Sequence, residues 1–158
     1  MRILVLSDIH GDYYSMKSAL DAQPAAEAIV FCGDGAEQFD YIQQTYTDKQ
    51  VIGVRGNCDW SSTLPPAETV NIGGKTLFVT HGHLYQAKFT VYNMICAARE
   101  QHADILLFGH THQAMTDYDD GLYMMNPGSC SGYGASYGVI DITPKGDVVT
   151  NIIKINNR

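Results

Sequence analysis

Residues 106–112 read Leu-Leu-Phe-Gly-His-Thr-His, and this stretch predicts both the fold and the place of the functional site. Its apolar part is short and continuous, as in a strand that is buried on both faces. The run ends at a glycine, and two histidines follow with one residue between them. Four other apolar runs end in the same way, at a glycine, aspartate, asparagine or histidine. This repetition indicates a common edge where the ends of several strands meet.

The elements predicted around these breaks alternate between strand and helix early in the chain and form hairpins later. Strands are expected at residues 2–6, 28–32, 50–54, 68–72, 75–80, 104–108, 114–118, 122–125, 137–143 and 148–155, and helices at about residues 14–22, 39–46 and 91–102. This order predicts an α/β fold with a mixed sheet, or two sheets packed between helices. Loops beyond the carboxyl ends of such strands gather at one edge, where ligands bind.

Length and composition restrict the classes of protein. A chain of 158 residues is expected to form a single domain over 1–158, and 45% apolar with 17% charged residues is typical of a globular protein. The net charge of −7 argues against nucleic acid as a partner, since that needs basic faces. No apolar run approaches the roughly 20 residues of a membrane helix, and no secretory signal is recognisable. Four widely spaced cysteines indicate free thiols and a cytoplasmic location.

The polar breaks supply residue types that bind metal ions. Each of these residues alone has an ordinary explanation, such as a helix cap for an aspartate or a turn for an asparagine. Seven of them at matching strand ends are hard to explain as independent accidents. The seven are Asp8, His10, Asp34, Asn57, His81, His110 and His112.

These side chains offer imidazole, carboxylate and amide donors, which suit divalent ions such as Mn, Fe or Zn. Seven ligands are too many for one catalytic ion that must also hold water, whereas two ions with one bridging carboxylate would receive about four each. Such a centre attracts an anionic phosphoester and lowers the pKa of a bound water. If residues 110–112 are extended, the two histidines point the same way about 6.6 Å apart, a spacing that permits one ion or two.

Five short motifs, taken together and in order, resemble those of the calcineurin-like metallophosphoesterases. They are Asp-Ile-His-Gly from residue 8, Gly-Asp from 33, Gly-Asn from 56, His-Gly from 81 and Gly-His-Thr-His from 109. Gly-Asn-Cys-Asp from residue 56 and Asn-Pro-Gly-Ser from 126 narrow the resemblance to the small bacterial and archaeal YfcE-type phosphodiesterase branch. The resemblance covers the chain from residue 1 to about residue 155.

The resemblance implies a four-layer αββα sandwich, with two mixed sheets flanked by helices, and a dinuclear centre. One metal would be held by Asp8, His10 and His112, the other by Asn57, His81 and His110, and Asp34 would bridge them. Mn is the expected metal, with Fe, Zn, Ni and Co as alternatives. A metal-bound hydroxide would attack phosphorus in line, so Asp34, Asn57 and His110 would act catalytically through the activated water. No organic cofactor is implied.

Three neighbours of these ligands have less certain roles. Larger members of the family carry a histidine that protonates the leaving oxygen at the position of Cys58. A thiol is a poor substitute acid, and we expect Cys58 to be a packed small side chain. His83 is expected beside the ligands or facing the substrate, and Asp12 either orients a ligand or caps a helix.

The leading prediction is therefore an enzyme, a phosphodiesterase acting on a small phosphoester. A phosphomonoesterase needs the same ions and is the first alternative. From a different class, a non-catalytic scaffold resembling the retromer subunit of the same fold is the second. The sequence leaves the natural substrate, the physiological metal and homo-oligomer formation open.

Overall fold

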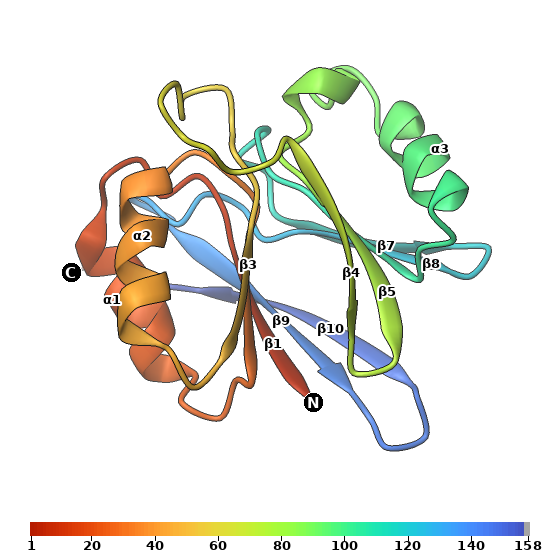
Figure 1. The fold of residues 1–158 in the computed structure, drawn as a ribbon, viewed down its shortest axis with the longest axis horizontal. Coiled ribbons are helices and arrows are strands. Elements are labelled where there is room, and N and C mark those ends of the chain that lie inside the picture. The colour runs from red at the N-terminus through yellow and green to blue at the C-terminus, as the bar shows by residue number, and fades with distance from the viewer. Residues whose placement is uncertain (157–158) are drawn as a thin grey trace.

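Two five-stranded β-sheets form the centre of the molecule in the computed structural model, which describes residues 1–156 (Figure 1). The strands are β1 (Arg2–Leu6), β2 (Ala28–Phe31), β3 (Gln50–Gly53), β4 (Ala67–Ile72), β5 (Lys75–Thr80), β6 (Ile105–Leu107), β7 (Met115–Asp119), β8 (Leu122–Asn126), β9 (Ser136–Ile142) and β10 (Val148–Lys154). The helices are α1 (Tyr13–Ala22), α2 (Ala36–Thr45), α3 (Tyr92–Glu100) and the short 3₁₀ helix η1 (His83–Tyr85). All the strands and α-helices expected from the sequence are present, with ends shifted by a few residues. The last two residues of the expected 1–158 domain lie outside the described range.

The order of strands brings the polar breaks together. The first sheet has the order β10-β9-β1-β2-β3, in which β1, β2 and β3 are parallel. Leu6 pairs with Phe31, and Phe31 pairs with Gly53, so these three strands end side by side. The second sheet has the order β4-β5-β6-β8-β7, with β5, β6 and β8 parallel. The chain segments that follow β1, β2, β3, β5 and β6 therefore leave the two sheets at the same edge.

Alternation along β1 shows how the layers pack. Ile3 and Val5 face the second sheet, in a core that includes Leu77 and Leu107. The intervening Leu4 and Leu6 face the other way and belong to the cluster that contains α1 and α2. Successive strand residues point to opposite faces, so one fully apolar strand serves two cores.

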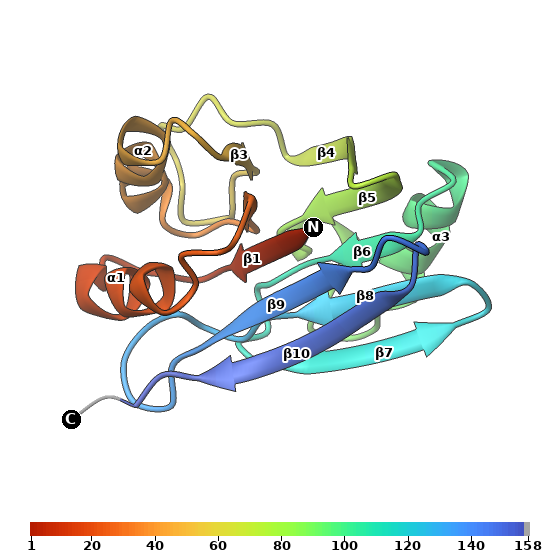
Figure 2. The ribbon, with the colours of Figure 1, turned by 90° about the horizontal axis from the view of Figure 1, so that it is seen from below.

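The second sheet is covered on its outer face by α3. Phe78, Leu106 and Met124 pack there with Met94 and Ala98 of this helix. Figure 2 shows α1 and α2 on one side of the paired sheets and α3 on the other. The structure confirms the four-layer αββα sandwich. Over residues 1–156, no helix is long and apolar enough to cross a membrane.

Candidate metal centre

The seven predicted metal ligands lie at the edge where the ends of the two sheets meet. Four of them follow strands of the first sheet: Asp8 and His10 come after β1, Asp34 after β2 and Asn57 after β3. The other three, His81, His110 and His112, follow β5 and β6 of the second sheet. The site is thus assembled between the sheets, and neither sheet provides it alone.

Asp8 lies at the centre of the group and is fully buried. Its Oδ2 accepts hydrogen bonds from the Ser7 hydroxyl (2.6 Å) and the His110 N–H (3.0 Å). Its Oδ1 has no hydrogen-bond partner. A buried carboxylate oxygen without a partner is energetically costly, and a bound cation removes that cost.

Three imidazole nitrogens surround this unpartnered oxygen. The distances from Asp8 Oδ1 are 3.2 Å to Nε2 of His112, 3.6 Å to Nε2 of His10 and 3.8 Å to Nε2 of His81. The Nε2 atoms of His10 and His112 are themselves 3.3 Å apart. These donors converge on a small volume from three different loops, as the ligands of an ion do.

His81 connects this group to the second half of the site. Its Nδ1 lies 2.7 Å from the carbonyl oxygen of Cys32, and because a carbonyl only accepts, Nδ1 must donate. This bond fixes the ring and directs Nε2 towards Asn57 Oδ1 (3.0 Å) and Asp34 Oδ2 (3.3 Å). A histidine that ligates a metal commonly donates its other N–H in this manner. His110 packs its ring against that of His81, with the centroids 5.0 Å apart.

The electrostatics of Asp34 and His81 are coupled. Burial favours a higher pKa for Asp34, but hydrogen bonds from His81 and the Cys58 N–H outweigh burial and hold the pKa well below its usual range. Burial favours a lower pKa for His81, but the hydrogen bond to Asp34 and the charge of Asp8 outweigh it and raise the pKa. Without a metal ion, the ionised form of Asp34 and the protonated form of His81 therefore stabilise each other.

The donor set fits divalent metal ions. Donor atoms of Asp8, His10 and His112 lie within 4.8 Å of one another, and so do those of Asp8, Asp34 and His81. The two groups share Asp8, and Asp34 also approaches His10 Nε2 at 3.9 Å. Two carboxylates placed between two sets of imidazoles provide oxygen and nitrogen ligands for ions such as Mn²⁺ or Zn²⁺. The two groups contain five of the seven residues predicted from the sequence.

The profile of the calcineurin-like phosphoesterase superfamily domain matches residues 1–145. The chain belongs to this superfamily. The probable metallophosphoesterase YsnB of Bacillus subtilis is 31% identical over 130 residues, which cover 82% of this chain and 75% of YsnB. Phosphodiesterase YfcE of Escherichia coli is 30% identical over an alignment that covers 100% of this chain and 94% of YfcE. The resemblance inferred from the motifs is confirmed, and the chain is a phosphoric ester hydrolase.

Among solved structures, Vps29 from Entamoeba histolytica in complex with Zn²⁺ has the same fold. Its TM-score is 0.75 at 23% identity, and the match covers 98% of this phosphoesterase and 99% of that chain. At this identity the comparison supports the αββα architecture alone.

The backbone of the phosphoesterase is strained at the ligands. Five of them have a positive φ: Asp8 (52°), His10 (45°), Asp34 (61°), His110 (69°) and His112 (59°). Residues other than glycine rarely adopt a positive φ, and backbone strain of this kind concentrates at functional sites. The condition considered from the sequence, an extended segment at residues 110–112, is not met. Left-handed turns direct the two histidines instead, so the 6.6 Å spacing of a strand does not apply.

Cys58 is exposed at the site, which corrects the expectation that it is a packed small side chain. Its Sγ lies 3.6 Å from Asn57 Nδ2, and donor atoms of Cys58, His10 and Asp34 lie within 4.8 Å of one another. Burial and the nearby charge of Asp34 raise the pKa of the thiol. Cys58 therefore faces the site but is a weaker acid there than in water.

His83 and Asp12 occupy different surroundings. The ring of His83 lies 5.4 Å from that of His81 and 6.1 Å from that of His110, beside the ligands as expected. Asp12 caps α1 by accepting the N–H of Ser15, and it also accepts the N–H of Gly132. Asp12 therefore caps a helix, which was one of the two roles expected for it from the sequence.

Asp59 also lies beside the ligands, and from the sequence it was expected, like Asp12, either to orient a ligand or to cap a helix. Its carboxylate accepts four backbone N–H groups, from Asp34 (2.8 Å), Gly35 (2.9 Å), Ala36 (3.0 Å) and Gly56 (2.7 Å). Two of these donors open α2, whose N-cap Gly35 has no side chain to satisfy them. Asp59 thus joins the loop that carries Asp34 to the loop that carries Asn57.

The Asn-Pro-Gly-Ser motif supports the site from behind. The Ser129 hydroxyl donates to the backbone oxygen of Asp8 (2.8 Å), and Asn126 donates to Gly109 O (3.0 Å) and Thr111 Oγ1 (2.9 Å). These bonds hold the strained turns on which Asp8 and the His110–His112 pair lie. The Asn-Pro-Gly-Ser motif was recognised in the sequence, but only these hydrogen bonds show that it supports the turns of the ligands.

Proposed function

We propose that this phosphoesterase is a phosphodiesterase that hydrolyses a small phosphoester at a dinuclear centre, with Mn²⁺ as the preferred metal. The observation that carries the proposal is the fully buried, unpartnered Oδ1 of Asp8 within 3.2–3.8 Å of three imidazole nitrogens. Support for two ions comes from the two ligand groups that share Asp8.

When bound, two divalent ions supply an activated water for in-line attack on phosphorus and neutralise the charge that develops on the phosphoryl oxygens. We assign Asp8, His10 and His112 to one ion and Asn57, His81 and His110 to the other, with Asp34 between them. The hydrogen bond from Nδ1 to the Cys32 carbonyl oxygen holds the ring of His81, and the three N–H bonds that Asp59 accepts from residues 34–36 hold the loop of Asp34. No side chain is required to form a covalent bond with phosphorus.

The charge next to the site favours a diester over a monoester. Besides the ligand Asp34, three carboxylates line the groove, those of Glu37, Asp40 and Asp59. A monoester carries a second negative charge on its phosphate, which meets more repulsion there than the single charge of a diester. YfcE, which is named a phosphodiesterase, supports the same choice. The presence of every ligand residue disfavours the scaffold alternative, since a scaffold has no use for a buried, unpartnered carboxylate.

The partners and location follow from the same features. A small phosphoester is the proposed partner, and nucleic acid is not expected. Cys32, Cys58, Cys96 and Cys130 are all free thiols, which supports the inference of a reducing cytoplasmic location.

The test combines metal content with activity. We would count metal ions per chain after loading with Mn²⁺, Fe²⁺, Zn²⁺, Ni²⁺ or Co²⁺, and assay bis(nitrophenyl) phosphate and nitrophenyl phosphate. The wild type should bind about two ions and prefer the diester, and Asp34→Asn should lose at least one ion and most of the activity. Asp48→Asn, an exposed acidic residue in the α2–β3 loop, is the matched control. Stoichiometry of one ion, or full activity of Asp34→Asn, would contradict the proposal.

A further inference from the structure

His83 lies next to the metal ligands, and the proposed centre gives it no task. It is the first residue of η1, and its ring centroid lies 5.4 Å from that of His81 and 6.1 Å from that of His110. Among the described residues whose donor atoms gather within 4.8 Å of one another, His83 does not appear. Its imidazole is therefore a neighbour of two ligands of the proposed second ion without being a ligand itself.

The turn that carries His83 is held firmly in place. The carbonyl oxygen of Gly82 accepts hydrogen bonds from the N–H groups of Tyr85 (3.0 Å) and Ala87 (3.1 Å). A Cβ added to Gly82 would lie 2.9 Å from the Cβ of Ala87 and 3.3 Å from the sulfur of Met94, so the turn packs tightly against α3. The fold thus fixes the position of the imidazole, as it does for groups that recognise a ligand.

The two ring nitrogens of His83 have different surroundings. Among the side chains of residues 1–156 that are not exposed, two polar atoms are both buried and without a hydrogen-bond partner: Oδ1 of Asp8 and Nδ1 of His83. Nε2 of His83 also makes no hydrogen bond within this part of the chain, but it is not buried. Both orphaned atoms lie at the ligand edge, and unsatisfied groups of this kind require an explanation.

The burial of Nδ1 favours the proton on Nε2. A neutral imidazole carries one N–H, and a buried N–H without an acceptor is rarer in proteins than a buried acceptor without a donor. With the proton on Nε2, this N–H reaches solvent and only the lone pair of Nδ1 stays without a partner. His83 then presents a hydrogen-bond donor beside the ligands, and a nitrogen that carries a proton cannot bind a metal ion.

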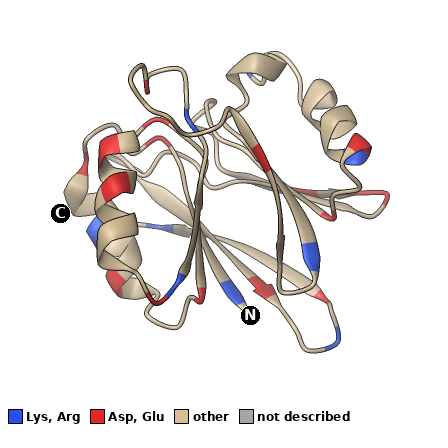
Figure 3. Cartoon of the chain, viewed as in Figure 1, with Lys and Arg blue, Asp and Glu red and all other residues tan. Residues whose placement is uncertain are grey.

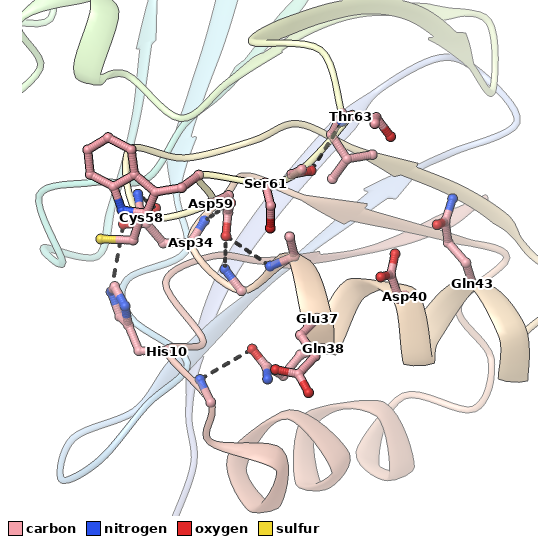
Figure 4. Close-up of a pocket in the computed structure, with 16 residues that line it drawn as sticks. His10, Asp34, Glu37, Gln38, Asp40, Gln43, Cys58, Asp59, Ser61 and Thr63 are labelled. Atoms are coloured by element: carbon pink, nitrogen blue, oxygen red, sulfur yellow. Dashed lines mark hydrogen bonds and ion pairs between the residues drawn. The ribbon is translucent and has the colours of Figure 1, made fainter.

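The substrate has room on the side of the ligands opposite to His83. A groove of about 780 Å³ begins at His10, Asp34 and Cys58 and runs along the start of α2 (Figure 4). Its walls come from the loops after β1, β2 and β3 of the first sheet, whereas His83 follows β5 of the second sheet. An ester substituent in the groove would therefore leave the phosphate facing the loop of His83.

Few other groups are placed to bind the phosphate on the groove side. None of the described residues that line the groove is a lysine or arginine, and Figure 3 shows the basic residues scattered singly over the fold. Cys58 stands where larger members of the family carry a histidine, and a thiol is a weak hydrogen-bond donor. An imidazole N–H from the second sheet would supply a strong donor instead.

We propose that His83 is a substrate-binding residue whose Nε2–H donates a hydrogen bond to a non-bridging phosphoryl oxygen. The inference rests on the proposed phosphodiesterase function and adds a contact that the ligands do not provide. The oxygen is negatively charged in the bound ester and in the transition state, so the donor stabilises both. Loss of one hydrogen bond to a charged oxygen should weaken phosphate binding about 10–100-fold.

Three substitutions at this position separate the two nitrogens. The amide nitrogen of His83→Gln can reach the place of Nε2, that of His83→Asn reaches only the place of Nδ1, and His83→Leu has no donor. Inorganic phosphate is titrated calorimetrically into the full chain loaded with Mn²⁺. The affinity should fall about 10–100-fold in His83→Leu and His83→Asn, and His83→Gln should stay within about threefold of the wild type.

Metal binding distinguishes contact with the substrate from support of the ligands. Stoichiometry and affinity for Mn²⁺ should be the same in all three variants and in the control His102→Asn, an exposed residue before β6, at the end of that strand opposite to His110. Weaker Mn²⁺ binding by His83→Leu would assign His83 a supporting role and overturn the proposal. Wild-type phosphate affinity in His83→Leu, an affinity of His83→Gln as low as that of His83→Leu, or no phosphate binding by the wild type would overturn it as well.

Kinetics identify the oxygen that accepts the hydrogen bond. Wild type and His83→Leu are compared on methyl nitrophenyl phosphate and methyl chlorophenyl phosphate, which differ in the leaving group alone. A donor to a non-bridging oxygen should lower kcat/KM by the same factor for both esters, about 10–100-fold. A larger factor for the chlorophenyl ester would place His83 at the leaving oxygen and refute the assignment. If the wild type cleaves neither ester, the proposed phosphodiesterase function has failed, and the phosphate titration still decides the role of His83.

Discussion

At the scale of single residues, the candidate centre depends on two carboxylates, those of Asp8 and Asp59, which differ in how many hydrogen bonds they accept. Asp8 keeps one oxygen free of hydrogen bonds, whereas Asp59 uses both of its oxygens on four N–H groups. The free oxygen of Asp8 is available to an ion, whereas the bonds of Asp59 join the loop of Asp34 to the loop of Asn57. Burial alone does not distinguish a ligand from a support, but the hydrogen bonds do.

Asp59→Asn should weaken both the fold and metal binding. Each carboxylate oxygen of Asp59 accepts two N–H groups, and in asparagine one of these oxygens becomes an NH₂ group, which cannot accept them. About two of the four hydrogen bonds are therefore lost, which costs about 2–4 kcal/mol of folding free energy. Chemical denaturation of the metal-free protein measures the first effect, and calorimetric titration with Mn²⁺ measures the second. Asp48→Asn, without a comparable network, should leave both unchanged. Unaltered Mn²⁺ affinity in Asp59→Asn would show that the network does not position the ligands.

Cys58 should not serve as the acid for the leaving group. Burial and Asp34 raise the pKa of its thiol, so Cys58→Ala is expected to cleave nitrophenyl diesters within about twofold of the wild type. For the same reason the wild type should cleave alkyl diesters about 10²–10⁴ more slowly than nitrophenyl diesters. Steady-state rates on the two ester classes check both statements. Equal rates on the two classes would mean that another group donates the proton.

Metal affinity should fall as the pH falls, because His81 must be neutral to bind an ion. Its pKa is raised, so the imidazolium form already competes with the metal at pH values above the ordinary titration range of histidine. Below the raised pKa, each pH unit should lower the affinity by about tenfold for one displaced proton. Titrations of Mn²⁺ in a pH series measure the slope. A flat profile between about pH 8 and pH 6 would exclude His81 as a ligand.

At the scale of elements, each ligand lies in a turn just after a strand, and each turn is held by a contact from another element. Left-handed φ angles at Asp34 and His110 direct the side chains inward. A hydrogen bond from the Asp34 N–H to Asp59 and one from the Asn126 side chain to Gly109 O fix the loops. The loop after β3 lies directly against the loop after β2. A Cβ added to Gly56 would overlap the carboxylate of Asp34, so this glycine permits the β3 loop to lie against the β2 loop.

Gly56→Ala should therefore abolish metal binding more than it unfolds the protein. The overlap displaces Asp34 from the other ligands, and we expect at least a hundredfold loss of Mn²⁺ affinity. Gly121→Ala is the control, since a Cβ there meets no atom within 4 Å although its φ of +84° makes the substitution strained by about 1–2 kcal/mol. The control should lose stability and keep its affinity. Both quantities can be read from melting curves with and without Mn²⁺.

At the scale of the whole molecule, the centre joins two sheets that otherwise meet through apolar contacts. Asp34 and Asn57 approach it from the first sheet, and His81 and His110 from the second. An ion bound between them therefore stabilises the packing of one sheet on the other, as well as the loops.

Removal of metal should lower the melting temperature of the entire domain. At a metal concentration of about 100 times Kd, binding contributes about 2.7 kcal/mol to the folded state. For a chain of this length that corresponds to a shift of about 5–10 °C. Scanning calorimetry before and after chelation measures the difference, and Asp34→Asn should show less than half of it. A melting temperature that is unaffected by chelation would mean that no ion bridges the sheets.

The sequence by itself determined the strands and helices, the α/β class and the residue types at the strand ends, whereas the αββα layers were implied by the resemblance to the metallophosphoesterases. It could do so because these properties depend on local patterns: an apolar run fully buried as in β1, and a polar break where the chain leaves the sheet. The seven candidate ligands were named for the same reason, and the structure brings their loops to one edge.

Only the tertiary structure decided how those residues face one another. The left-handed turns at His110 and His112 are imposed by contacts with Asn126 and Asp8, which are distant in sequence. The exposure of Cys58 and the acidic groove beside it likewise depend on where the β3 loop meets α2. Hydrophobic periodicity records which face of an element is buried, but it carries no information about the conformation of a loop that two other segments hold in place.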